Sequence, residues 1–382
     1  MITDATILYL YTEAPLHVGT GSGLSNIDLP IQRERTTQYP MIQGSSIKGK
    51  MRATAELLLE EQEAKKKENN TSSNQQTTGS SPVAQQNTSN NIVSRQDIEL
   101  LFGSSRPSTE ETNNTNVSNT SATADADKKG HAGSLIFGDA RLLLFPVRSL
   151  NGVFAYTTCC CVLDRFLRNM EKTSSGSLMG KISSNQSIEL KVPQEPKKDE
   201  SGIPKALVTK GSMVAQGGKL MLEEFAFTAS SEQQDMVTAI ADWLATNALP
   251  QYQNNTYFQE KLKNSLVILP DNEFRDFALY ATEVITRIAI DRATKTVTGT
   301  ALWTEENLPA DTLLYVPVYA TDARMPGRQE KGSEIIQRAR GLNTIVKYFQ
   351  LGGDETVGRG MVRPRWAEST NGQIKQTNGK GQ

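Results

Sequence analysis

Apolar and polar positions alternate along the chain in short segments that predict strands separated by helices. Runs rich in apolar residues predict strands at 7–11, 135–145, 153–162, 266–269 and 313–319. Apolar residues at helical spacing predict helices at 47–61, 231–244, 270–280 and 335–346. This order indicates an α+β fold, with an antiparallel sheet and helices segregated to one face.

Two hairpins are also predicted. Segments 284–291 and 296–303 have strand character and are expected to pair across the turn at 292–295. A second stretch, 193–218, is rich in Lys, Pro and Gly and is the candidate for a thumb or a mobile hairpin.

A polar tract at 60–129 interrupts this pattern. It consists mainly of Asn, Ser, Thr and Gln, and contains too little apolar surface to offset the entropy lost on ordering. Within it, Ile98, Leu101 and Phe102 have helical spacing. We therefore expect two disordered linkers flanking a short docked helix at 92–102.

The composition is that of a globular protein. The 382 residues are 37% hydrophobic and 22% charged. No apolar run approaches the length of about 20 residues that a membrane span needs, and the first residues lack the features of a signal peptide. The three cysteines, Cys159 to Cys161, are consecutive, which argues against a disulfide framework or a metal site and favours buried thiols. We expect a cytoplasmic protein without a membrane partner.

Charge is distributed unevenly although the net charge is −1. Segment 31–52 has five basic residues and one acidic residue, and segment 324–365 has nine basic and four acidic residues. Such runs are usually solvated surface, but two basic regions around a neutral middle are compatible with a local track for phosphates.

Four segments contain residues suited to chemistry or anion binding. His17 to Gly23 is a glycine-rich loop after a strand, and Leu351 to Arg363 is a second glycine loop with basic residues. Asp28 lies between apolar neighbours, a position that a simple turn former also takes. Gly44 to Arg52 combines a helix start with three basic residues, which is an anion site by its physics or an exposed helix edge.

These segments carry a family resemblance when they are taken together. The motifs that carry it are Leu16-His17-Val18-Gly19-Thr20-Gly21, Asp28-Leu29-Pro30-Ile31-Gln32-Arg33-Glu34, Pro40 to Gly49, Phe137 to Leu142, Phe145 to Leu150, Leu302 to Pro309 and Gly352 to Gly360. In this order they resemble the RAMP superfamily of CRISPR proteins, and more closely the repeated backbone subunit of type III-B (Cmr) effector complexes. Trp303 and Asn307 depart from the aromatic residues expected there.

The resemblance implies a single RAMP domain over 1–366 with a flexible tail at 367–382. Its fold would be a modified ferredoxin-like (RRM-like) palm with an inserted β-hairpin thumb. Copies would stack in a filament along CRISPR guide RNA with other Cmr complex subunits. The thumb would kink the duplex of guide and single-stranded target RNA, and the target would be cut beside each kink.

The resemblance also implies roles for individual residues. Asp28 would be required for cleavage, with His17 and Glu305 near the reacting groups. Mg²⁺ or another divalent cation bound by Asp28 is compatible with this, because Mg²⁺ often takes only one or two protein carboxylates. Asp28 would either hold this ion or orient the 2′-OH. The residues expected to bind RNA are Gly19, Gly21, Arg33, Ser45, Ser46, Lys48, Lys50, Arg52, Gly358, Arg359 and Gly360.

Three alternatives stay open. One is a metal-independent ribonuclease that uses the only two histidines, His17 and His131, as acid and base. Another is a structural filament subunit that binds guide RNA without cutting. A third is the equivalent subunit of a type III-A complex, although the motifs at 28–34 and 145–149 favour type III-B.

Overall fold

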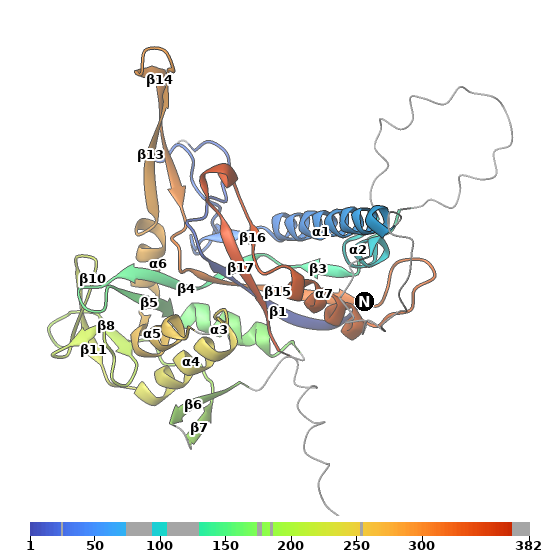
Figure 1. Ribbon diagram of the computed structural model, residues 1–382. Coiled ribbons are helices and arrows are strands. Elements are labelled where there is room, and N and C mark those ends of the chain that lie inside the picture. The colour runs from blue at the N-terminus through green and yellow to red at the C-terminus, as the bar shows by residue number, and fades with distance from the viewer. Residues whose placement is uncertain are drawn as a thin grey trace, which may run out of the picture. The chain divides into compact units, whose positions relative to one another are not determined.

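The chain was analysed as a computed structural model that describes residues 1–23, 26–73, 94–104, 130–173, 178–183, 186–252 and 255–368 (Figure 1). It divides into two compact units. The first is formed by residues 1–5, 48–136 and 319–346. The second is formed by residues 6–47, 137–318 and 347–382.

A large mixed sheet is the main element. In spatial order its strands are β16 (Phe349–Gln350), β17 (Met361–Trp366), β1 (Ile2–Thr12), β15 (Leu313–Thr321), β4 (Ala140–Arg148), β5 (Phe154–Cys159), β12 (Leu266–Leu269), β8 (Lys205–Val208), β11 (Phe225–Ser230), β10 (Lys219–Leu222) and β9 (Ala215–Gln216). In addition, β2 (Met41–Ile42) pairs with β4, and β3 (Leu135–Phe137) pairs with β15.

The expectation of a purely antiparallel sheet was wrong at two places. β5 pairs with β12 in parallel, and β8 pairs with β11 in parallel. Helical connections separate β5 from β12 in the chain, and such a crossover returns the chain in the same direction. The α+β character of the fold is nevertheless confirmed.

Helices of the second unit pack against this sheet. They are α3 (Cys160–Met170), α4 (Gln234–Asn247), α5 (Tyr257–Ser265) and α6 (Asp271–Tyr280). Every residue of β12 is buried, as expected of a strand covered on both faces. The strand predicted for 153–162 ends at Cys159, because the chain turns into α3 there. Cys159 and Cys160 are buried and Cys161 is partly exposed, all as free thiols.

The hairpin predicted near 284–303 is confirmed. It is formed by β13 (Glu283–Ile290) and β14 (Val297–Asn307), which pair antiparallel. Figure 1 shows it projecting from the rest of the second unit. Segment 193–218, the candidate for a thumb or a mobile hairpin, contributes β8 and β9 to the main sheet. A small separate hairpin is formed by β6 (Met179–Ser183) and β7 (Gln186–Glu189).

The first unit contains the helices α2 (Arg95–Phe102) and α7 (Gly332–Ile345) and most of α1 (Gly44–Ser73). α2 is the predicted docked helix; it is capped by Ser94 and buries Ile98, Leu101 and Phe102. The expectation of disorder from residue 60 was wrong up to residue 73, where α1 continues. Glu, Lys, Gln and Ala are good helix formers, which explains the continuation.

The rest of the polar tract, 74–93 and 105–129, lies outside the described residues, as does most of the predicted tail. Across the part of the chain that the structure describes, no helix has the length and apolar character of a membrane span.

Candidate functional site

Three segments that are far apart in the sequence meet at the base of the β13–β14 hairpin. The segment 16–34 pairs with the end of β14 through hydrogen bonds from Leu29 N to Thr304 O (3.0 Å) and from Glu306 N to Leu29 O (3.0 Å). The second glycine loop joins them, because Gly353 N donates to His17 O at 2.9 Å. The convergence of the two glycine loops is therefore set by backbone hydrogen bonds.

Glycine is required at two positions of the second loop. Gly352 has φ +75°, and a Cβ there would lie 2.0 Å from His17 O. Gly360 has φ +74°, and a Cβ would lie 1.9 Å from Leu351 O. At both positions the backbone conformation and the close approach exclude a side chain, so Gly352 allows the two loops to touch and Gly360 allows the second loop to close on itself.

Asp28 is exposed and is held by a single residue of β14. Its Oδ2 accepts hydrogen bonds from Thr304 N at 2.7 Å and from Thr304 Oγ1 at 2.9 Å. These bonds, the backbone one first, hold the pKa of the Asp28 carboxyl below its usual range. Oδ1 makes no hydrogen bond with any described residue. The carboxylate is thus ionised, fixed in orientation and open on one side.

A buried charge cluster lies on the opposite face of the hairpin base. Arg287 of β13 forms ion pairs with Glu305 Oε2 at 2.8 Å and with Asp354 Oδ2 at 2.5 Å. The Glu305 side chain is only 4% exposed, and burial, followed by the nearby Asp354, raises the pKa of its carboxyl. His17 Nδ1 lies 3.9 Å from Glu305 Oε1 and donates to Glu306 O at 2.6 Å. The predicted site residues His17 and Glu305 are therefore together, in a cluster that fastens the hairpin.

Arg33, predicted to bind RNA, is used inside the protein. Its guanidinium pairs with the buried Glu306 carboxylate and donates to Ala278 O at 2.9 Å. Glu306 also accepts from Ile31 N at 3.0 Å. With 12% of its side chain exposed, Arg33 holds the Asp28 segment against α6 and β14.

The start of α1 lies close to the first glycine loop through Gln32. Gln32 Nε2 donates to Gly19 O at 3.2 Å, and its Oε1 accepts from Gln43 N at 3.2 Å. Ser45 and Ser46 are exposed at the first turn, as an anion site requires. Three N–H groups of this turn are already used: Gly44 N donates to Asp139 Oδ1 at 2.9 Å, and Ser46 N and Ile47 N donate to Gln43 O at 3.0 and 3.4 Å.

The predicted basic residues of α1 belong to the first unit and have internal partners. Lys48 Nζ donates to Leu135 O at 3.0 Å, and burial, followed by the nearby Arg324 and Arg52, lowers the pKa of its ammonium. Arg52 Nε pairs with Glu56 Oε1 at 2.9 Å. Lys50 is half-buried.

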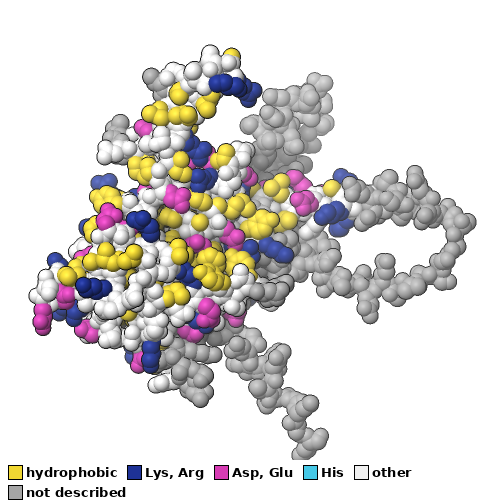
Figure 2. All heavy atoms as spheres, turned by 60° about the vertical axis from the view of Figure 1, so that its left-hand side comes forward, with side chains coloured by type: hydrophobic (Ala, Val, Ile, Leu, Met, Phe, Trp, Pro, Cys, Tyr) yellow, Lys and Arg dark blue, Asp and Glu magenta, His cyan; other side chains and the backbone are white. Residues whose placement is uncertain are grey.

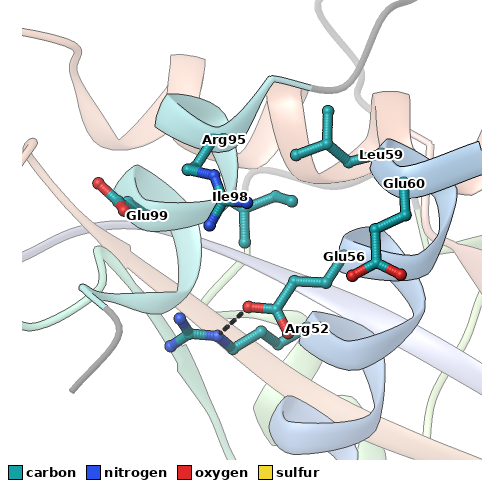
Figure 3. A pocket seen from close by; sticks show the side chains of 7 residues that line it. All are labelled: Arg52, Glu56, Leu59, Glu60, Arg95, Ile98 and Glu99. Atoms are coloured by element: carbon teal, nitrogen blue, oxygen red, sulfur yellow. Dashed lines mark hydrogen bonds and ion pairs between the residues drawn. The ribbon is translucent and has the colours of Figure 1, made fainter. Parts of the chain in front are cut away.

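Figure 3 shows the Arg52–Glu56 pair at the edge of a cavity of about 250 Å³ between α1 and α2. Two arginines, three glutamates, Leu59 and Ile98 line it. The mixture of both charges makes this cavity a poor phosphate site.

The remaining predicted RNA-binding positions lie in the two glycine loops. Gly19 pairs with Ile31, and Gly21 has φ +94° with open space around its Cβ position. Gly358 has φ +79° and is likewise open. Arg359 lies 3.8 Å from Glu283 Oε2 by its Nη1, at the base of β13. Each glycine loop therefore presents exposed backbone, the first loop at Gly21 and the second loop at Gly358.

The two histidines of the metal-free alternative are in different units. His131 belongs to the first unit, where its backbone bonds Ser104, and His17 belongs to the second. Within the described ranges no three His, Cys, Asp or Glu side chains form a group suited to a metal ion.

Sequence reasoning missed three residues that organise the site, namely Thr304, Gln32 and Arg287. Thr304 lies in the motif at 302–309 and Gln32 in the motif at 28–34. These motifs indicate that both residues matter but do not indicate what each one does. For Arg287 the sequence indicates only that the residue lies in a predicted strand. Their partners are 276, 11 and 67 residues away in the chain, so only the folded chain shows them.

Comparison with known proteins completes this picture. Residues 9–363 match the family model described as the RAMP superfamily. Over 369 residues the chain is 31% identical to the CRISPR system Cmr endoribonuclease Cmr4 of Pyrococcus furiosus, covering 96% of this chain and 97% of that protein. It is 27% identical over 150 residues to the CRISPR system CMR subunit Cmr4 of Saccharolobus solfataricus, covering 38% and 46%.

Solved structures show the same fold. The crystal structure of oligomeric Cmr4 from Pyrococcus furiosus superposes with a TM-score of 0.59 at 25% identity, covering 96% of this chain and all (100%) of that one. A chain of the type III-B Cmr-beta complex bound to cognate target RNA gives a TM-score of 0.57 at 21% identity, covering 96% and 98%.

Proposed function

The chain belongs to the RAMP superfamily and is a homologue of the Cmr4 proteins of type III-B CRISPR complexes, and from this we propose that it binds guide RNA along its length and cleaves target RNA at Asp28. One observation carries the proposal. Asp28 presents an ionised carboxylate, whose Oδ1 receives no hydrogen bond from another described residue, at the base of a projecting hairpin.

The chemistry suits cleavage by the RNA's own 2′-OH. A carboxyl whose pKa lies below its usual range is a weak base near neutral pH, so Asp28 contributes more by orienting the 2′-OH or by holding a cation than by taking up a proton. Much of the rate of in-line attack at a splayed nucleotide then comes from the alignment of the reacting groups. The hairpin β13–β14 is the thumb that would splay the nucleotide, and the main sheet would form the ferredoxin-like palm.

A divalent cation is part of the proposal. A single open carboxylate fits Mg²⁺, which keeps most of its waters and takes phosphate oxygens as further ligands. Bound at Asp28, the ion would neutralise charge on the phosphate. Loss of cleavage in EDTA, with recovery on addition of Mg²⁺, is the expected result.

RNA backbone would be held by the glycine loops and the exposed first turn of α1. Gly19, Gly21 and Gly358 would supply close approach, and Ser45 and Ser46 would donate hydrogen bonds. Gly360 is buried and its N–H donates to Pro15 O at 2.8 Å, so we assign it to the shape of the second glycine loop. Lys50 would contribute charge. Since Arg33 is paired inside the protein, we assign it to holding the Asp28 segment instead of RNA.

Partners follow from the relatives. Oligomeric Cmr4 and a Cmr complex with target RNA have been solved for them. We infer for this chain a cytoplasmic ribonucleoprotein in which copies contact one another, guide RNA, target RNA and other Cmr subunits.

The test is the substitution Asp28→Asn in the assembled complex. We expect target cleavage to fall at least about 100-fold, the range for a lost catalytic group, while guide and target binding stay unchanged. Asp276→Asn, an exposed carboxylate on α6, is the matched control and should cleave normally.

Two outcomes would replace the proposal. Unchanged cleavage by Asp28→Asn would indicate that the chain is a structural filament subunit that does not cut RNA. Cleavage that persists in EDTA and disappears in His131→Ala would establish the histidine mechanism.

A further inference from the structure

Thr304 is the only described residue that hydrogen-bonds the Asp28 carboxylate, and it does so twice. Its backbone N–H and its hydroxyl both donate to Oδ2, at 2.7 and 2.9 Å. The hydroxyl oxygen in turn accepts from Asp28 N at 3.0 Å. This reciprocal arrangement fixes the carboxylate about its side-chain torsions and leaves the other oxygen uncommitted.

The same threonine belongs to the hairpin. In β14 it lies opposite Thr286, and the next pair on that face is Ile288 with Leu302. Both of these side chains are largely exposed, at 47% and 63%, and Figure 2 shows apolar side chains along the projecting hairpin. Asp28 is therefore attached to the hairpin face that offers apolar surface.

We propose that Thr304 is the positioning residue for Asp28, holding Oδ2 so that Oδ1 is presented to the RNA and linking the carboxylate to the β13–β14 hairpin. The inference rests on the proposed cleavage function and names the residue that makes Asp28 competent. Thr304 does not touch the reacting atoms; it acts through Asp28.

A purely structural role for Thr304 makes a different prediction. The Asp28 segment is also held by the backbone bonds of Leu29 to β14 and by the Arg33–Glu306 pair. Removing the Thr304 hydroxyl therefore leaves the segment in place and alters mainly the carboxylate. A structural role would affect assembly and RNA binding, whereas a positioning role affects the cleavage step and is rescued by Thr304→Ser.

The experiment compares Thr304→Val, Thr304→Ser and Thr286→Val in the assembled complex with guide RNA. Thr304→Val keeps the shape and the backbone N–H but loses the hydroxyl. Thr304→Ser keeps the hydroxyl, and Thr286→Val is the control on the same hairpin face. The readouts are guide binding and the single-turnover cleavage rate of target RNA between about pH 5 and 8, the range around carboxyl and histidine titration.

Thr304→Val should cleave roughly tenfold more slowly at neutral pH, the effect expected from one hydrogen bond to a charged group, with unchanged guide binding. Thr304→Ser should restore most of the rate, and Thr286→Val should match the wild type.

Wild-type cleavage by Thr304→Val across this pH range overturns the inference, as does an equal deficit in Thr304→Val and Thr286→Val. The proposed function is tested separately by Asp28→Asn. If Asp28→Asn is inactive while Thr304→Val is normal, only the positioning role fails. If Asp28→Asn cleaves normally, the function itself fails.

Discussion

At the scale of residues, the surroundings of a side chain decide its role more than its type does. Gly352 and Gly358 belong to the same loop and both have positive φ, at +75° and +79°. A Cβ at Gly352 would meet His17 O at 2.0 Å, whereas nothing lies within 4 Å of one at Gly358. The first glycine joins two loops, and the second only turns the chain.

This pair gives a direct prediction. Gly358→Ala should lower the free energy of unfolding by about 1 kcal/mol, the cost of a left-handed conformation for a residue with a Cβ. Gly352→Ala should cost clearly more, roughly 3 kcal/mol or above, because the hydrogen bond between the loops must also break. Denaturant unfolding of both variants measures the difference. Equal losses would contradict the close contact of the loops.

Arg33 and Asp28 show the limit of reasoning from residue types. Both lie in one motif, and both were expected to meet RNA. The folded chain places a buried carboxylate, Glu306, against Arg33 and leaves Asp28 exposed. Since Glu306 is 273 residues from Arg33 in the chain, the local sequence contains no sign of this pairing.

At the scale of elements, the β13–β14 hairpin was predictable and its attachment was not. β13 alternates partly buried and exposed positions along its whole length, which is the period-two pattern of a strand. Arg287 sits on one face of it and joins Glu305 of β14 to Asp354 of the second glycine loop. Thr304 joins the other face to Asp28. The hairpin is thus fastened on both faces at its base.

Arg287→Met tests this attachment. The substitution removes the ion-pair partner of Glu305, whose side chain is only 4% exposed. We therefore expect the free energy of unfolding to fall by roughly 2 kcal/mol. This is less than the full cost of breaking a buried ion pair because Arg287 is partly exposed. Amide exchange in β13 and β14 should also accelerate. Arg292→Met, at the exposed hairpin turn, is the control. Unchanged exchange in both variants would show that the ion pairs do not fasten the hairpin.

Element boundaries were the less predictable part. The pattern at 153–162 was read as one strand, but the chain leaves the sheet at Cys159 and continues as α3. The helix predicted to begin at residue 231 begins at Gln234, after Gln233 with φ +56° and no side-chain cap. A short apolar run fits either a buried strand or a buried helix, and only packing distinguishes the two.

At the scale of the whole molecule, charge is balanced overall and guide binding must depend on local features. The net charge is −1, and several predicted RNA-binding cations have internal partners, as Arg33 and Arg52 do. A filament that accepts any guide must contact phosphate and sugar, with the A-form shape and the 2′-OH giving preference for RNA.

We therefore expect the affinity of the protein for guide RNA to fall steeply as salt rises, with the same slope for guides of different spacer sequence. On a plot of log affinity against log salt, each phosphate contact contributes about −0.7 to the slope for a single strand. Titrations with two unrelated spacers measure this. A flat slope, or a strong preference for one spacer, would argue against backbone recognition.

The sequence by itself determined the α+β class, the polar insertion, the docked helix, the pairing of β13 with β14 and the motifs that place the chain in its family. These depend on short-range patterns of side chains, which the sequence displays directly. Only the tertiary structure decided that Thr304 holds Asp28, that Glu306 occupies Arg33 and that Gly352 touches His17. Each of these contacts joins residues hundreds of positions apart, and its energy depends on burial and geometry that exist only once the chain has folded.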